Sequence, residues 1–295
     1  MLSTLRSSDE IFVANAQRLS ARIDAANRQI NSGKRIHVVS DDPDQVGTLF
    51  ASRSDLGRME QIDRNLGQIK TEVDTAEGAL QSALKLMDRA STLGAQGSTG
   101  VATPQSRTIL SQEIQSLLDG MVALTQTSVQ GRFIFAGDSD QTRPYEVDTS
   151  FYAGTPATRR ALHPTGASFQ IARAADEIWD NAAPAQNVFA NLRAMRDALA
   201  AHDDAAIGTA LGGLRSAGEH LNQQLAFYGT TQGRLQEAGE IAKTEVTRLR
   251  VQISSIEDTD LLAASLELNV ATRDYQAALQ ARAKADRGSL FDYLG

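Results

Sequence analysis

The chain has 295 residues and a formal net charge of −7 at pH 7, from 29 basic and 36 acidic residues. This acidic balance argues against a nucleic-acid partner, because a phosphate backbone requires a basic surface. Cysteine is absent, which excludes disulfides, thiolate metal sites and a catalytic thiol, and the lack of a long apolar run argues against a membrane span.

The first expected helix covers residues 3–31 and ends at Asn31, Ser32 and Gly33. Apolar residues alternate in it by four and three, which places them on one helical face. They are Phe12, Ala16, Leu19, Ile23, Ala26 and Ile30. The stretch from Met1 to Asn15 lacks the apolar core of a secretory signal peptide, which favours the cytoplasm unless another export route applies.

Asp41, Asp42 and Pro43 predict the start of a second helix, since Asp caps helices and Pro fits the first helical position. Its apolar pattern runs over residues 44–96 and corresponds to roughly 80 Å of continuous helix. Such a length is typical of a rod. Thr103 and Pro104 predict the start of a third helix, which is expected to end by Gly131.

The middle of the chain differs from its flanks. The run from Gly131 to Gly137, which includes Arg132, Phe133 and Phe135, predicts a strand. Residues 138–185 lose the helical period and predict a small β-rich insertion with Trp179 in a packing role. Its strand-like pieces are Tyr145–Val147, Phe151–Tyr152 and Ser168–Ala172.

Helices are expected to resume near Asn187 and near Asp203, with a bend at Gly229 and Gly233. Asp258 or Asp260 can cap the final helix. Two heptad series mark that helix: Leu261, Leu268 and Tyr275, and Ala264, Ala271, Ala278 and Ala285. Both ends of the chain thus carry a narrow apolar seam, and such a seam needs a partner helix.

These patterns predict a mainly α fold, with a long antiparallel helical bundle or coiled coil formed by the N- and C-terminal arms. We expect three parts. They are a terminal coiled-coil assembly domain (1–42 and 255–295), a helical rod domain with a β-hairpin (43–137 and 186–254), and a small β-rich outer domain (138–185).

We find no motif for catalysis, cofactor binding or metal binding, so we expect no enzyme and no cofactor. The four histidines are not spaced as a helical zinc pair, and Asp138-Ser139-Asp140 lacks the remaining ligands of a calcium loop. Asp41 and Asp42 are better explained by helix capping than by acid–base chemistry.

Several segments resemble the bacterial flagellins and their hook-associated relatives. Ser32-Gly33-Lys34-Arg35 and Ser40-Asp41-Asp42-Pro43 resemble the segment after the first helix of that family. The run from Gly131 to Gly137 is similar to the hairpin strand of the relatives called hook-associated protein 3, which join hook to filament. Residues 255–260 and the closing segment, with Leu290 and Phe291, resemble the C-terminal region of the family.

The resemblance implies a structural, self-assembling protein of the flagellar hook–filament junction. It implies secretion to the flagellum by type III export without a cleaved signal, with another hook-associated protein, flagellin and an export chaperone as partners. Neither nucleic acid nor a membrane is an expected partner. Assembly is then expected to use Phe12, Leu19, Ile23, Ile30, Leu261, Leu268, Tyr275, Leu290 and Phe291.

Two alternatives remain open. One is a filament flagellin with a small outer domain, which copy number per flagellum would distinguish. The other is a cytoplasmic helical scaffold or signalling module, which would need neither a β insertion nor unpaired helical ends.

Overall fold

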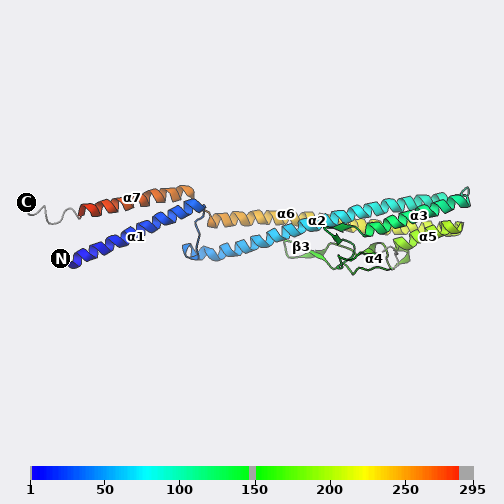
Figure 1. The fold of residues 1–295 in the computed structure, drawn as a ribbon, viewed down its shortest axis with the longest axis horizontal. Helices are drawn as coiled ribbons and strands as arrows, with labels where there is room; N and C mark the ends of the chain where they lie inside the picture. The colour runs from blue at the N-terminus through cyan, green and yellow to red at the C-terminus, as the bar shows by residue number, and fades with distance from the viewer. Residues whose placement is uncertain (1, 146–150, 286–295) are drawn as a thin grey trace, which may run out of the picture. The chain divides into compact units, whose positions relative to one another are not determined.

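The computed structural model describes residues 2–145 and 151–285, and the chain divides into two compact units. The terminal unit comprises residues 1–57 and 246–295, and the central unit comprises residues 58–245. The fold is mainly α, as predicted (Figure 1). The longer helices are α1 (Leu2–Ser32), α2 (Pro43–Gly97), α3 (Pro104–Thr125), α5 (Val188–Ala201), α6 (Asp204–Glu257) and α7 (Leu261–Ala285).

Side-chain caps define where several helices begin. Asp42 Oδ1 accepts a hydrogen bond from Gln45 N (3.2 Å) immediately before α2, whose first residue is Pro43. Asp260 caps α7 by accepting from two backbone N–H groups, at 2.9 and 3.1 Å. Both starts agree with the sequence prediction, because a carboxylate oxygen accepts hydrogen bonds from N–H groups that the helix leaves without partners. Thr103 and Asn187 cap α3 and α5 in the same way.

In the terminal unit, α1 and α7 pack against each other and run antiparallel (Figure 1). Arg22 on α1 forms an ion pair with Glu267 on α7 at 2.7 Å. The Arg282 guanidinium lies 6.0 Å from the centre of the Phe12 ring. The prediction that the two terminal seams pair within one subunit is therefore confirmed.

The central unit is built on α2, α3, α5 and α6. Glycines allow close helix approach near the end of α2. A Cβ on Gly97 would lie 2.2 Å from Leu199 Cδ2 on α5, and one on Gly94 would lie 2.6 Å from Met195 Cε. Arg107 on α3 pairs with Asp204, the first residue of α6. α6 continues as an α-helix through Gly229 and Gly233, the positions at which the sequence predicts a bend.

The β structure is limited, within the described residues, to two small antiparallel pairs. β1 (Ser128–Val129) pairs with β2 (Arg132–Phe133) across Gln130 and Gly131, both of which have positive φ. A two-residue type I′ hairpin turn requires this backbone conformation. β3 (Arg160–Leu162) pairs with β4 (Ser168–Gln170). The short helix α4 (Ala175–Ile178) follows β4. Two 3-10 turns are η1 (Val39–Asp41), between α1 and α2, and η2 (Pro184–Gln186), before α5.

The strand predicted between Gly131 and Gly137 is wrong beyond Phe133. The residues from Ile134 to Gly137 are buried in turns, and Phe135 O accepts a hydrogen bond from Ala175 N (2.8 Å). Aromatic and branched residues occur there because they fill a core, in which Phe135 meets Trp179 edge-to-face at 4.7 Å. This confirms the packing role predicted for Trp179, which is fully buried.

The other predicted strand pieces fare unevenly. Ser168–Ala172 contains β4, whereas Phe151–Tyr152 forms no strand. Tyr145 is buried outside any strand, and Glu146 and Val147 lie outside the described residues. The division into three domains stays a prediction.

Candidate assembly interface

The α1 seam occupies the positions that the sequence indicates. Ala26 is buried, at 2% exposure, and the other seam residues are half-buried. These half-buried residues are Phe12, Ala16, Leu19, Ile23 and Ile30. A single partner helix therefore covers only part of each large side chain in one copy.

The α7 seam is narrower than predicted. Its buried positions are the alanines Ala264 (4% exposed) and Ala271 (0%), while Leu268 and Tyr275 are half-buried. Leu261 was expected within this seam, but it is 54% exposed because it is the first residue of α7 and lies at the end of the helix pair. Small side chains at the seam let the two backbones approach closely. Leu290 and Phe291 lie outside the described residues.

A short backbone pairing joins the segment after α1 to the end of α6. Gly33 has a left-handed φ of +70°, which ends α1, and its carbonyl accepts from Thr259 N at 2.9 Å. Arg35 N donates to Glu257 O at 2.6 Å, so Lys34 and Asp258 form an isolated antiparallel bridge. Gly33 thus turns the chain toward a segment more than two hundred residues away.

Glu257 lies at the centre of this terminal region and was missed by the sequence reasoning. Its side chain is 4% exposed and pairs with Lys34 and with Arg53, the latter at 2.5 Å. Burial acts to raise the pKa of Glu257, but the hydrogen bonds and positive charges of Lys34 and Arg53 outweigh it, so the pKa is lowered. One signal could have found it: an acidic residue in the last turn of a helix opposes the macrodipole and calls for a cationic partner.

Asp41 and Asp42 organise the linker between α1 and α2. Asp41 Oδ2 accepts from the backbone N–H groups of His37 (2.7 Å) and Val38 (2.9 Å). The bonds from Val38 and then His37 lower the pKa of Asp41. Asp42 Oδ2 pairs with Arg35 at 2.9 Å, in addition to capping α2. Both aspartates thus accept hydrogen bonds from backbone N–H groups around the start of α2, as the capping interpretation predicts.

The hairpin motif is anchored to α2 in the central unit. Arg132 Nη2 bonds Glu72 Oε1 at 2.5 Å, and Arg159 Nη2 bonds Glu72 Oε2 at 2.8 Å. Gly137 has φ +68°, and a Cβ there would lie 1.6 Å from Thr155 O. Phe133 is half-buried and Gly131 is exposed in the turn. Arg132 therefore fastens the hairpin motif to α2, and Gly137 allows the close approach of Thr155.

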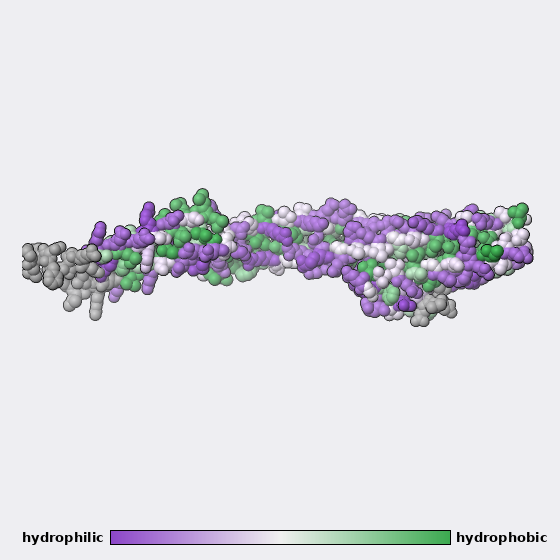
Figure 2. Space-filling view, turned by 45° about the horizontal axis from the view of Figure 1, so that its top comes forward, coloured by the Kyte–Doolittle hydropathy of each residue, from purple (hydrophilic) through white to green (hydrophobic). Residues whose placement is uncertain are grey.

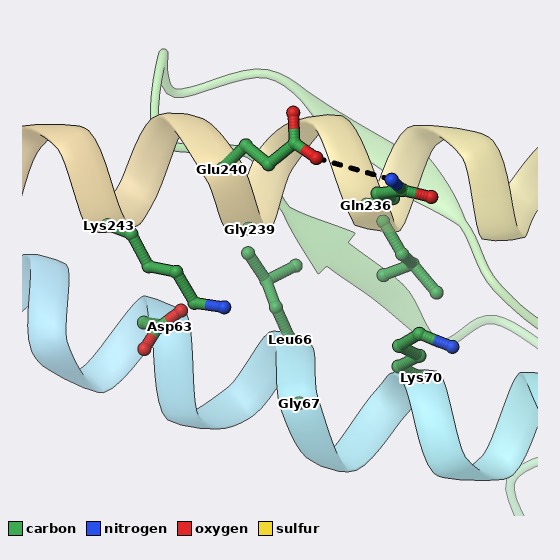
Figure 3. Close-up of a pocket in the computed structure, with 9 residues that line it drawn as sticks. Asp63, Leu66, Gly67, Lys70, Gln236, Gly239, Glu240 and Lys243 are labelled. Atoms are coloured by element: carbon green, nitrogen blue, oxygen red, sulfur yellow. Dashed lines mark hydrogen bonds between the residues drawn. The ribbon is translucent and has the colours of Figure 1, made fainter.

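A cleft of about 320 Å³ lies between α2 and α6 in the central unit (Figure 3). It exists because Gly67 and Gly239 bring no side chains to it, and its rim alternates positive and negative groups. Figure 3 shows Lys243 extending toward Asp63, while Glu240 accepts a hydrogen bond from Gln236 at 3.2 Å. Rim charges of both signs select no single class of charged ligand.

The described part of the chain holds no group of three or more His, Cys, Asp or Glu residues suited to a metal ion. Within the same residues, no helix is long and apolar enough to cross a membrane. The polar cluster around Glu257 connects two segments that are distant in the sequence. Among the described residues, the features that remain as candidates for function are therefore the surfaces through which helices pair.

Comparison with known proteins gives the family. Residues 7–140 match the bacterial flagellin N-terminal helical region, and residues 211–294 match the bacterial flagellin C-terminal helical region. Flagellar hook-associated protein 3 of Escherichia coli is 25% identical over 154 residues, which cover 52% of this chain and 49% of that relative. Flagellin B of Helicobacter pylori is 28% identical over 44% of this chain and 25% of its own length.

The crystal structure of Bacillus cereus FlgL superposes with a TM-score of 0.59 at 24% identity, covering 69% of this chain and 99% of that one. This likeness concerns the fold. The chain spans about half of the length of the hook-associated relative that it matches. Its two family regions enclose the insertion and include both helical arms. The chain belongs to the bacterial flagellin family.

Proposed function

We propose that this chain is a structural subunit of the bacterial flagellum that assembles with copies of itself at the junction between hook and filament. The hook-associated relative and the FlgL fold support the junction over other positions in the flagellum. One structural observation carries the assembly role: after α1 and α7 pack together, large apolar residues of the terminal unit remain exposed. They include Ile11, Val13, Val38, Val39, Phe50, Leu262 and Leu266.

Exposed apolar residues in this number are unfavourable for an isolated subunit and are buried when subunits associate. Residues 255–295 and 1–42 are the proposed assembly domain, and the paired helices of the central unit supply lateral contacts. The function is structural and uses neither catalysis nor a cofactor. Another hook-associated protein and flagellin are the proposed neighbours along the flagellum.

Deletion of the gene tests this proposal. We expect hooks without filaments, with flagellin released into the medium, and restoration by the full chain supplied from a plasmid. Normal filaments in the deletion strain would refute the junction role.

A filament flagellin is the second candidate, because the match to Flagellin B is of similar strength. Quantitative mass spectrometry of purified flagella separates the two. A junction subunit is present in far fewer copies than the major filament protein, whereas a filament flagellin is the major protein itself.

The export route is part of the proposal. We infer secretion through the flagellar channel without a cleaved signal, aided by an export chaperone. The intact N-terminal peptide in the chain recovered from flagella would support it, and a shortened N-terminus would contradict it.

A further inference from the structure

The α2–α6 rod, by which we mean the parts of α2 and α6 that belong to the central unit, is supported unequally along its length. Where α3 and α5 lie beside α2, glycines of the rod are places of close packing. A Cβ on Gly94 would lie 2.6 Å from Met195 Cε, and one on Gly213 would lie 2.1 Å from Asn191 Oδ1. We call this part, which includes residues 205–226 of α6, the braced section. A bend there would disturb the packing against α5.

A second section of the rod lacks such packing at its glycines. Residues 67–78 of α2 and 229–239 of α6 face each other there, since Gln232 Nε2 donates to Asp74 Oδ1 at 2.8 Å and also to Glu77 Oε2. A Cβ on any glycine of these two stretches would meet no atom of a neighbouring element within 4 Å, among the described residues. The glycines are Gly67, Gly78, Gly229, Gly233 and Gly239. We call this part the open section.

An apolar docking surface gives no reason for these glycines either. No large hydrophobic residue within 67–78 or 229–239 is exposed, and hydrophilic side chains cover most of the face of the rod that Figure 2 shows. What the glycines change is therefore the stability of the two helices themselves.

Glycine and threonine make both helices weak at this level of the rod. Glycine lowers the equilibrium constant for helix formation about five-fold relative to alanine, and threonine lowers it less. α6 carries the run Gly-Thr-Thr-Gln-Gly at residues 229–233. The hydroxyls of Thr230 and Thr231 donate to carbonyl groups one turn earlier, at 2.9 and 2.8 Å, and those of Thr71 and Thr75 on α2 do the same. Such hydrogen bonds slightly destabilise a helix and often bend it.

The two helices are also incompletely packed against each other beside these residues. The cleft of about 320 Å³ includes Gly67 and Gly239, at one end of the open section (Figure 3). Thr231 is 2% exposed, so a small polar residue takes a place on the buried side of α6. Side chains beside a void lack partner atoms on one side, which lowers the resistance to a small displacement.

We propose that the open section is a joint at which the α2–α6 rod bends, while the braced section moves as one body. Both helices are weak at the same level, so a bend lengthens only a few backbone hydrogen bonds in each. The insertion reaches this level through Arg132 and Arg159, which share Glu72, and these long side chains can follow a small displacement. The joint goes beyond the proposed function and does not depend on it. In an assembly, it would let one end of a subunit adjust to a neighbour while the braced section keeps its place.

Distances between pairs of spin labels on the full chain test the joint. The chain has no cysteine, so two introduced cysteines can be labelled selectively. Gln223→Cys with Thr244→Cys spans the open section, and Ala205→Cys with Ala226→Cys spans the braced section. The four positions are exposed, and each pair is separated by roughly 32 Å of helix. We expect the distance distribution across the open section to be wider by about two-fold or more. Equal widths would overturn the proposal.

Alanine substitutions in the labelled chain test whether the glycines cause the bending. Gly229→Ala with Gly233→Ala should narrow the distribution across the open section to the width of the braced one, and should slow hydrogen exchange at residues 229–239 by about ten-fold. Gly208→Ala with Gly212→Ala is the matched control, because these glycines have the same spacing on α6 and open space for each Cβ. The control should leave the width across the open section unchanged. An unchanged width in the first variant, or equal narrowing in both, would also overturn the proposal.

Discussion

The buried carboxylate of Glu257 offers the sharpest test of how the terminal unit is held together. Glu257→Gln removes the charge and keeps the shape of the side chain. The amide can accept a hydrogen bond from only one of Lys34 and Arg53, and its own NH₂ group then faces a cation. A hydrogen bond to a charged group contributes about 1.5–3 kcal/mol, but both cations are about half exposed and regain water. We therefore expect a cost of about 2 kcal/mol.

The loss should be local, because the affected groups join residues 33–35 to residues 257–259. Hydrogen exchange measured by mass spectrometry or NMR reports the opening of such backbone bonds. A cost of about 2 kcal/mol corresponds to roughly 30-fold faster exchange at Arg35 N and Thr259 N. Exchange in the buried part of α3 should be unchanged, since α3 belongs to the central unit.

Glu267→Gln is the matched control. Glu267 also pairs with an arginine, but the two side chains are 44% and 41% exposed. Water screens an exposed pair strongly, so the control should change exchange far less than Glu257→Gln does. Equal effects of the two substitutions, or less than a two-fold effect of Glu257→Gln, would refute the reasoning from burial.

Three further predictions follow from contacts described above. Folding lowers the pKa of Glu257 from 4.5, so the stabilisation from this carboxylate is complete above pH 4.5 and is lost as pH falls through the lowered pKa. A pH series of hydrogen exchange should therefore show faster exchange at Arg35 N only below about pH 4.5. A constant rate after correction for intrinsic exchange would contradict this. Gly137→Ala should lower the free energy of unfolding by about 3 kcal/mol or more in urea titrations, because the new Cβ would overlap the backbone carbonyl of Thr155. Gly131→Ala has open space around the new Cβ and should lower it by only about 1–2 kcal/mol, and similar values for both would be inconsistent with the close approach at Gly137. Ala271→Leu should overpack the α1–α7 seam and lower the free energy of unfolding by about 1–3 kcal/mol in the same titration. Leu262→Ala, at an exposed position of α7, should change it by no more than about 0.5 kcal/mol, and an unchanged stability of Ala271→Leu would show that the seam is loosely packed.

The helices could be predicted closely because their signals are local. An apolar period and a cap at Asp42 gave residues 44–96 for the helix that spans Pro43–Gly97, and residues 3–31 for Leu2–Ser32. Each signal acts within one or two turns and leaves a direct trace in the sequence. Pairing of the two seams followed because each was too narrow and too apolar to remain alone.

The insertion could not be predicted in the same way. Its strands contain two or three residues, which is too short for an alternation to be visible, and Phe135 is buried by contacts with Trp179 and Ala175 from later in the chain. The Glu257 cluster depends on Lys34 and Arg53, at sequence separations that no local pattern encodes. Leu261 shows a smaller failure: it is the first residue of α7, and it remains 54% exposed.

The backbone pairing of Gly33 and Arg35 with residues 257–259 has a consequence for the order of events during translation. The first helix leaves the ribosome more than two hundred residues before residues 257–259 and its partner helix have been made. Residues 58–245 can form their own compact unit in that interval, while the N-terminal helix waits. A premature stop near codon 250 and an in-frame deletion of the first helix should therefore give the same phenotype, because each removes one half of a single unit that the ribosome completes last.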